Sequence, residues 1–179
     1  YAAFGREISA AAARRSPANC VAVVEYMDAL EPPAIAAQLL ALGREVEAVA
    51  VVAVDHPHVT AAIDTLHEQG KPVFTLLSDL SATHRVGCIG IDQRKAGRTA
   101  AWAISRLTGG EGAVGVFVGS HRYLGQETRE ISFRSYLREH APALRVLDTQ
   151  VNLEDAQLAY EATLAMLARH ADLAAIYVA

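Results

Sequence analysis

The chain has 179 residues, of which 52% are hydrophobic and 20% are charged, a composition that excludes a disordered segment and predicts a packed globular fold. Its formal net charge of −4 comes without any block of like charge, so this segment is not built to coat nucleic acid. No apolar stretch reaches the roughly 20 residues needed to cross a bilayer, and the first residues show no basic region or cleavage site of a secretory signal peptide.

Helical and strand patterns alternate along the chain. Apolar stripes of helical period predict helices over residues 4–11, 32–43, 59–70, 96–107, 126–140 and 152–170. Short apolar runs predict strands over residues 20–24, 48–54, 73–77, 86–91, 113–118, 144–151 and 173–178. We expect Pro32 and Pro33 to open the second helix, Gly43 to end it, and Asn152 to cap the last one.

The run 48–54 has no polar residue, which predicts a strand that is buried on both faces between layers of helices. Helices that alternate with such strands form βαβ units with right-handed crossovers, so we expect a doubly wound parallel sheet. The pattern opens with a helix and closes on a strand, which predicts an internal fragment of a longer protein. A complete small α/β domain is the alternative.

Other features of the sequence predict no chemistry. Cys20 and Cys88 lie in apolar runs, so we expect buried free thiols, and we expect Trp102 to lie in the core or in an interface. The sequence lacks a nucleophile elbow, a phosphate-binding Gly-Lys-Ser/Thr loop, a dinucleotide fingerprint and a Cys/His cluster. We therefore expect neither an enzyme, nor a cofactor, nor a metal site.

Three stretches carry a resemblance to a known family. The first is Ile91-Asp-Gln-Arg-Lys-Ala-Gly, where a strand ends in Asp before an Ala-rich helix. The second joins Gly115-Val-Phe-Val-Gly-Ser120 to Arg129-Glu-Ile-Ser-Phe133, and the third is Arg169-His-Ala-Asp-Leu-Ala-Ala-Ile-Tyr177, with Ala171 where the family has Pro. In their order and spacing these stretches resemble the LacI-type transcription repressors and the related periplasmic sugar-binding proteins. No single motif is specific, but together they span nearly the whole chain.

The resemblance implies an α/β fold of two doubly wound parallel-sheet lobes, of the periplasmic-binding-protein type I kind, truncated at both ends. Residues 1–91 would form the first lobe without its opening strand. Residues 92–179 would form the crossover and the first half of the second lobe. A small molecule, a sugar or sugar derivative, would bind in the cleft between the lobes, and hinge closure around it would be the signal.

Candidate ligand contacts follow the predicted strands and occupy the loop and helix start after residue 118. They are Asp55, Ser78, Asp79, Ser120, Tyr123, Glu127 and Arg129. Arg129 is the strongest candidate, because its guanidinium offers five donors in a fixed fork that suits vicinal hydroxyls or a carboxylate. The competing interpretation is a solvated helix arginine paired with Glu127 or Glu130.

Alternatives stay open at the other positions. Asp55 can accept hydrogen bonds from a sugar hydroxyl or cap the helix that follows it. Asp79 comes two residues after the position of the family's ligand-binding acid, so an ordinary loop carboxylate is its alternative. Ser120 and Tyr123 can donate to a sugar or belong to a polar surface loop. Asp92 is expected at the hinge, or as a helix cap.

The function that the resemblance implies is the effector-binding domain of a cytoplasmic LacI-family regulator. It would act as a homodimer that binds operator DNA through a helix-turn-helix outside this chain, with no membrane partner. The alternative is a periplasmic sugar-binding protein of an ABC transporter. A third possibility is a sugar-modifying enzyme, for which Asp55 and Asp79 are the only acid and base candidates.

Overall fold

The structure is a computed structural model that describes residues 2–14, 20–27 and 31–179, and these fall into two compact units, 1–30 and 31–179. In the first unit, helix α1 (Ala2–Arg14) follows the predicted stripe. The predicted strand 20–24 is wrong, since the described residues 20–27 contain no strand and Val21 is exposed. A strand requires a neighbour to pair with its backbone groups, and the described residues supply none here.

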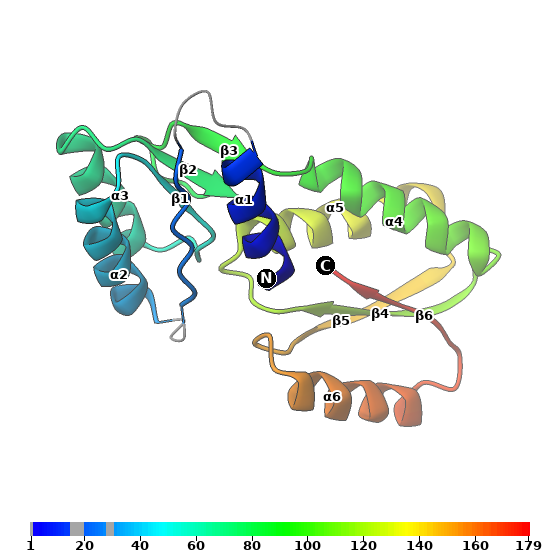
Figure 1. Cartoon of the computed structure of the whole chain (residues 1–179). Coiled ribbons are helices and arrows are strands. Elements are labelled where there is room, and N and C mark those ends of the chain that lie inside the picture. Colours follow the sequence, from blue (N-terminus) through cyan, green and yellow to red (C-terminus); the bar gives the residue numbers. More distant parts are fainter. Residues whose placement is uncertain (1, 15–19, 28–30) are drawn as a thin grey trace. The chain divides into compact units, whose positions relative to one another are not determined.

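The first sheet of the second unit holds three parallel strands in the order β1-β2-β3. They are β1 (Val49–Val51), β2 (Val73–Leu76) and β3 (Gly87–Ile89). Helices α2 (Pro32–Glu45) and α3 (Pro57–Glu68) pack against each other and lie on one face of this sheet (Figure 1). The strand–helix alternation of the sequence therefore becomes two layers in this half of the unit.

Strand β1 is shorter and less buried than the sequence predicts. Val49 and Val51 are buried, but Ala50 between them is exposed, so the expectation of burial on both faces is wrong. The reason is that α2 and α3 cover only the face to which Val49 and Val51 point. The core beneath these helices is built from fully buried side chains, namely Ile35, Leu39, Val59, Ile63, Leu66 and Val73.

Helix α2 does not end at Gly43 as expected but continues to Glu45. Gly43 is buried in the contact between α2 and α3, where an added Cβ would lie 2.3 Å from Cδ2 of Leu66. Because Gly43 has no side chain, α2 and α3 can pack closely at this point. The left-handed residue that follows α3 is Gly70, with φ of +73°.

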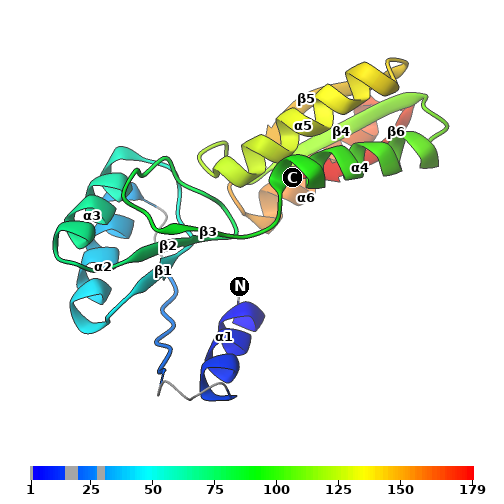
Figure 2. The same ribbon diagram turned by 90° about the horizontal axis from the view of Figure 1, so that it is seen from above.

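The second sheet is doubly wound. Its parallel strands β4 (Gly112–Val118), β5 (Leu144–Val151) and β6 (Leu173–Val178) take the order β5-β4-β6. Helices α4 (Gln93–Leu107) and α5 (Leu124–His140) cover one face, and α6 (Ala156–Arg169) covers the other (Figures 1 and 2). The central strand β4 is buried along nearly its whole length, as expected of a strand between two helix layers.

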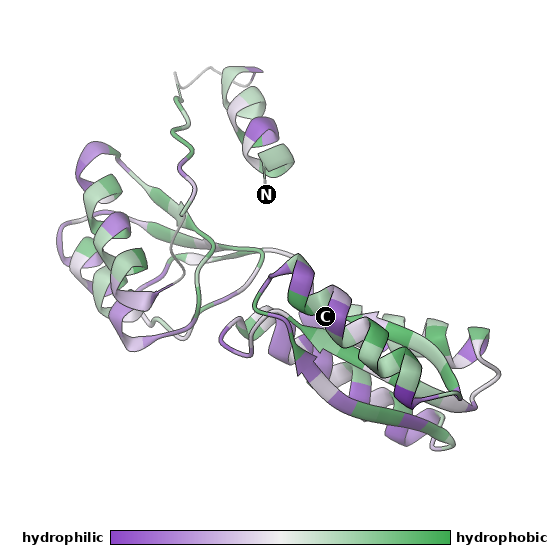
Figure 3. Ribbon diagram, turned by 90° about the horizontal axis from the view of Figure 1, so that it is seen from below, coloured by the Kyte–Doolittle hydropathy of each residue, from purple (hydrophilic) through white to green (hydrophobic). Residues whose placement is uncertain are grey.

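Residues from both faces of β4 fill the core of this half. On the α4 and α5 side, Val114 and Val116 pack with Phe133, whose ring stacks on Tyr177 of β6 with 4.2 Å between the centroids. On the other side, Gly115 makes room for Met166 of α6. Figure 3 shows green and purple residues alternating along the helices, the pattern of elements that bury one face.

The predicted fold class is confirmed: the chain is an α/β protein with two parallel sheets. The proposed lobe boundary between residues 91 and 92 falls between the two sheets, but the assignment of lobes stays a prediction. Within the described ranges, no helix is both long enough and apolar enough to span a membrane.

Three smaller expectations need correction. The cap of α6 is Asp155, whose side chain accepts from the backbone N–H of Leu158, and not Asn152. Cys20 and Cys88 are free, as expected, but both are exposed. Trp102 is half-exposed on α4 and so is not a core residue, because Gly97 and Ala101 form the buried face of that helix.

Candidate functional site

The loops after the carboxyl ends of the two sheets are joined by hydrogen bonds. The backbone N–H of Asp55, after β1, donates to the carbonyl of Arg122, after β4, at 2.7 Å. The hydroxyl of Ser78, after β2, accepts from the backbone N–H of Gly125 at 2.9 Å. The structure thus brings together Asp55, Ser78 and the loop that holds Ser120 and Tyr123, at the edge where parallel α/β sheets bind ligands.

Asp55 is held within the first sheet's loops by its side chain. Its Oδ1 accepts from the backbone N–H and the hydroxyl of Ser81, at 2.9 and 2.8 Å. The cap of α3 is His56, whose Nδ1 accepts from the N–H of His58, so the capping alternative for Asp55 is wrong. Asp55 also lines an open depression with Thr60 and other residues of α3, and its contact with a ligand stays a prediction.

Asp79 is engaged by neighbours of its own sheet. Arg85 donates to both of its carboxylate oxygens, at 2.6 and 2.7 Å, and Thr75 donates to Oδ1 at 2.8 Å. The hydrogen bonds from Arg85 are the main reason that the pKa of Asp79 is lowered from 3.8 to about 2. This arrangement favours the loop-carboxylate alternative, while ligand contact by Asp79 stays a prediction.

The Asp79–Arg85 pair predicts a specific acid sensitivity. Because the pKa is lower in the folded state, the pair stabilises the fold fully above about pH 4, where the unfolded carboxyl is ionised, and the contribution is lost as the pH falls through about 2. We expect the melting temperatures of the wild type and Asp79→Asn to differ at pH 5 and to converge towards pH 2. A difference that stays constant over this range would contradict a stabilising ionised pair.

The end of β2 has an unusual backbone. Leu77 adopts a left-handed φ of +62°, and its N–H donates to the carbonyl of Ile89 at 2.9 Å. Its own carbonyl accepts from Nε2 of Gln93 at 2.5 Å. Such conformations persist only where surrounding contacts hold them, and they are common at ligand sites. The conformation of Leu77 directs the next residue, the buried Ser78, towards Gly125 at the start of α5.

The loop after β4 is fixed by a second glutamine. Oε1 of Gln126 accepts from the N–H groups of Gly119 and Ser120, at 2.7 and 3.1 Å. Nε2 of the same side chain donates to Glu154, in the loop after β5, at 2.8 Å. Tyr123 lies shortly after Gly119 and Ser120, at the start of α5. Glu127 lies in the first turn of this helix and is half-buried. These contacts order the loop in which Ser120 and Tyr123 are predicted to meet a ligand.

Arg129 is half-buried and lies between α4 and the end of β6. One of its terminal nitrogens donates to Oε1 of Gln93 at 2.6 Å. Burial raises the pKa of Tyr177, and the nearby positive charge of Arg129 partly offsets the rise. Among the described residues, Arg129 forms no ion pair with Glu127 or Glu130. The alternative of a solvated arginine paired with one of these glutamates is therefore not observed.

Glu130 forms a separate buried network. Its carboxylate accepts from Arg134 at 2.8 Å, from the hydroxyl of Thr149 on β5, and contacts Nε2 of His121 at 2.9 Å. Burial alone would raise the pKa of Glu130, but the hydrogen bonds that it accepts, first from Thr149 and then from Arg134, outweigh burial and hold the pKa below its usual value. The network ties α5 to β5 and to the loop that carries Ser120 and Tyr123.

Several residues around the candidate site were not predicted from the sequence as part of it. Gln93, Gln126, Glu130 and Tyr177 all support the candidate site, and only Glu130 had a readable signal, a Glu–Arg pair four residues apart on one helix. Asp92 caps α4 by accepting from the N–H of Lys95, so its capping role is confirmed, while its hinge role stays a prediction. In the part of the chain that is described, no three acidic, His or Cys side chains converge to hold a metal ion.

Comparison with known proteins decides the family. The model of the periplasmic binding protein domain matches residues 3–179. The chain belongs to this family. It is a family of binding proteins, not typically enzymes. A search of curated protein sequences gave no match.

Solved structures share the fold at low sequence identity. An ABC transporter solute-binding protein from Burkholderia graminis, in complex with D-arabinose, is 20% identical, with a TM-score of 0.89, over 97% of this chain and 60% of that protein. One from Agrobacterium vitis, bound to α-D-tagatopyranose, is 22% identical with a TM-score of 0.81, over 98% and 60%. The fructose-binding periplasmic domain of a hybrid two-component system is 18% identical with a TM-score of 0.86, over 98% and 58%. The chain therefore spans about 60% of the length of the proteins whose structures it matches.

Proposed function

We propose that this periplasmic binding protein domain binds a monosaccharide at the carboxyl ends of its two sheets and works as a solute-binding protein of an ABC transporter. The observation that carries the proposal is the placement of Arg129. Arg129 is half-buried, and its positive charge acts on Tyr177. Its hydrogen bond to Gln93 uses only part of the guanidinium's donor fork. The remaining donors suit the vicinal hydroxyls of a sugar.

The neighbouring groups have the chemistry of a sugar site. The hydroxyl of Ser120 and the ring of Tyr123 lie in a loop that is ordered by Gln126, and the loop is bonded to the first sheet through Asp55. Hydroxyls bind sugar hydroxyls, and aromatic rings pack against the apolar face of a sugar ring. The arrangement supports a polar, aromatic-lined site for a neutral, polyhydroxylated ligand.

The choice between transporter component and repressor rests on the comparisons. The relatives described above are transporter solute-binding proteins and a sensor domain, and their bound or named ligands are monosaccharides. This favours the transporter function over the LacI-type repressor that the sequence motifs resemble. Cell fractionation of the native protein separates the two, since a transporter component works outside the cytoplasmic membrane and a repressor works inside it.

The experiment that tests sugar binding is a thermal-shift screen of the full protein with pentoses and hexoses, repeated with Arg129→Ala. A ligand that binds only the native state raises the melting temperature. Loss of a charge-assisted hydrogen bond predicts that Arg129→Ala weakens binding by at least about 10-fold. Arg138→Ala, an exposed arginine on the same helix, is the matched control and should bind like the wild type. No shift with any sugar would refute the proposal.

A further inference from the structure

Gln93 lies where the chain passes from the first sheet to the second, as the first residue of α4. The two ends of its side-chain amide contact different parts of the fold. Nε2 donates to the carbonyl of Leu77 at the end of β2, at 2.5 Å, and Oε1 accepts from Arg129 of α5 at 2.6 Å. One side chain thus connects a strand end of the first sheet with the guanidinium of the candidate site.

The surroundings of Gln93 are shaped to hold this amide. Gly125, in the first turn of α5, lies against it, and an added Cβ there would be 3.3 Å from the amide carbon and nitrogen of Gln93. On the other side, Leu77 presents its carbonyl from the left-handed conformation described above. The amide side chain supplies the two functions on separate atoms, Nε2 as the donor for that carbonyl and Oε1 as the acceptor for the arginine.

The contact between α4 and α5 adds to this constraint. Gly97, one helical turn after Gln93, is so close to α5 that an added Cβ would lie 2.2 Å from the backbone carbonyl of Arg129. The helix that carries Gln93 and the one that carries Arg129 therefore approach each other closely at the level of the site. The Gln93–Arg129 hydrogen bond forms across this contact.

We infer that Gln93 is a positioning residue, which fixes the guanidinium of Arg129 for the ligand and ties it to the end of β2. The ligand part of this inference rests on the proposed function. An arginine that is already held in its binding conformation does not have to be ordered when the ligand arrives, and ordering such a side chain weakens binding by roughly 2- to 10-fold.

The first test requires no ligand. The side-chain nitrogen signals of Arg129, assigned with Arg129→Lys, are recorded by NMR in the full protein. We expect the terminal nitrogens of Arg129 to give separate signals in the wild type, because the bond to Gln93 restricts their rotation, and to merge in Gln93→Ala. Gln93→Glu, which keeps the acceptor for Arg129, should retain separate signals. Unchanged Arg129 signals in Gln93→Ala would overturn the inference.

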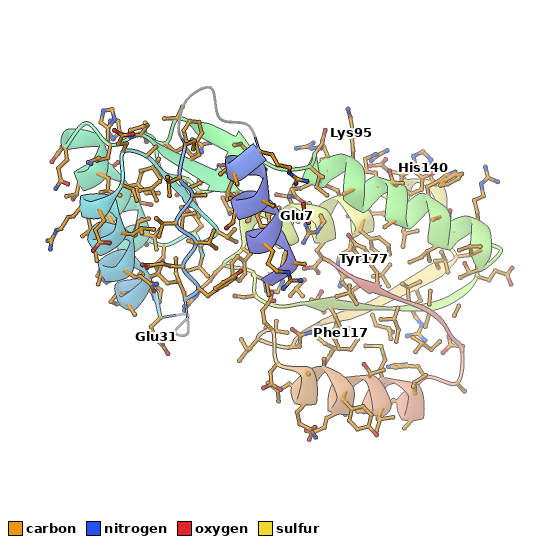
Figure 4. All side chains as sticks on the ribbon, in the orientation of Figure 1. Glu7, Glu31, Lys95, Phe117, His140 and Tyr177 are labelled. Carbon is orange, nitrogen blue, oxygen red and sulfur yellow. The ribbon has the colours of Figure 1, made fainter. Side chains whose placement is uncertain are left out.

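The second test is a double-mutant cycle of sugar affinity, measured by titration calorimetry. Gln93→Ala should weaken binding by roughly 2- to 10-fold in the wild-type background and have no further effect in Arg129→Ala. An equal loss in both backgrounds would show a merely structural role and overturn the inference. Lys95→Ala is the control, since Lys95 (labelled in Figure 4) extends from the same turn of α4 into solvent. If the wild type binds no sugar, the proposed function fails and the NMR result alone decides the role of Gln93.

Discussion

Phe133→Ala is expected to lower the free energy of unfolding by about 3–5 kcal/mol, the cost typical of truncating a buried aromatic side chain. Phe133 is 0% exposed and packs between α4, β4 and the ring of Tyr177. Its removal would leave a cavity at the centre of the second sheet's core. Chemical denaturation of the full protein, followed by circular dichroism, measures the change.

Two variants make this prediction specific. Ile131→Ala lies two residues earlier on the same helix, at a side chain that is 61% exposed, and should change stability by less than about 0.5 kcal/mol. Phe133→Leu keeps most of the apolar volume and should cost less than Phe133→Ala. Equal effects of Phe133→Ala and Ile131→Ala would contradict the packing of α5 on β4.

Glu130→Ala is expected to cost about 3 kcal/mol, at the lower end of the range for a broken buried pair because Arg134 is partly exposed. The substitution leaves Arg134 and Thr149 without the carboxylate to which both donate. Thermal unfolding of the two proteins at neutral pH measures the loss. Since His121 also loses its contact, the loop after β4 should become more protease-sensitive.

The control for Glu130→Ala is Glu139→Ala on the same helix. Glu139 is an exposed residue that pairs with Arg98, and its removal should lower stability much less than removal of Glu130, because water screens an exposed ion pair. Glu130→Gln separates charge from shape, because it keeps an acceptor for Arg134 but removes the negative charge. We expect its stability to lie between those of the wild type and Glu130→Ala. A loss for Glu139→Ala equal to that for Glu130→Ala would contradict a special role of the buried network.

The spacing of apolar residues predicted most of the helices and strands, because in the second sheet the apolar positions are the ones that pack into the core. The predicted strand 144–151 has the observed bounds of β5, and the apolar run 113–118 is the buried central strand β4. The wrong predictions concern segments whose structure depends on contacts with residues far away in the sequence. The apolar run 20–24 has no strand partner among the described residues, and Ala50 in the middle of β1 is exposed. An apolar run predicts that a strand is buried, but it does not show whether one face or both faces of the strand are covered.

The candidate site was only partly predictable. The resemblance pointed to Arg129 and the loop that holds Ser120, because strand, loop and helix follow one another locally in the sequence. The contact that holds Arg129 was not predictable, since Gln93 lies 36 residues away in the sequence. The two residues meet only because α4 and α5 pack closely against each other. Asp79 is a second example, since its carboxylate accepts from Arg85 six residues later in the chain, while its contact with a ligand stays a prediction. Residue type and spacing identify candidates, and only the three-dimensional partners assign their roles.

A crystal structure of the full protein, grown with the sugar that gives the largest thermal shift, would show directly whether Arg129 binds the ligand. We expect the sugar ring at the carboxyl ends of both sheets, with a hydroxyl within hydrogen-bond distance of the Arg129 guanidinium and with the Gln93–Arg129 hydrogen bond intact. A sugar bound elsewhere on the chain, with no contact to Arg129, would contradict the proposed binding site.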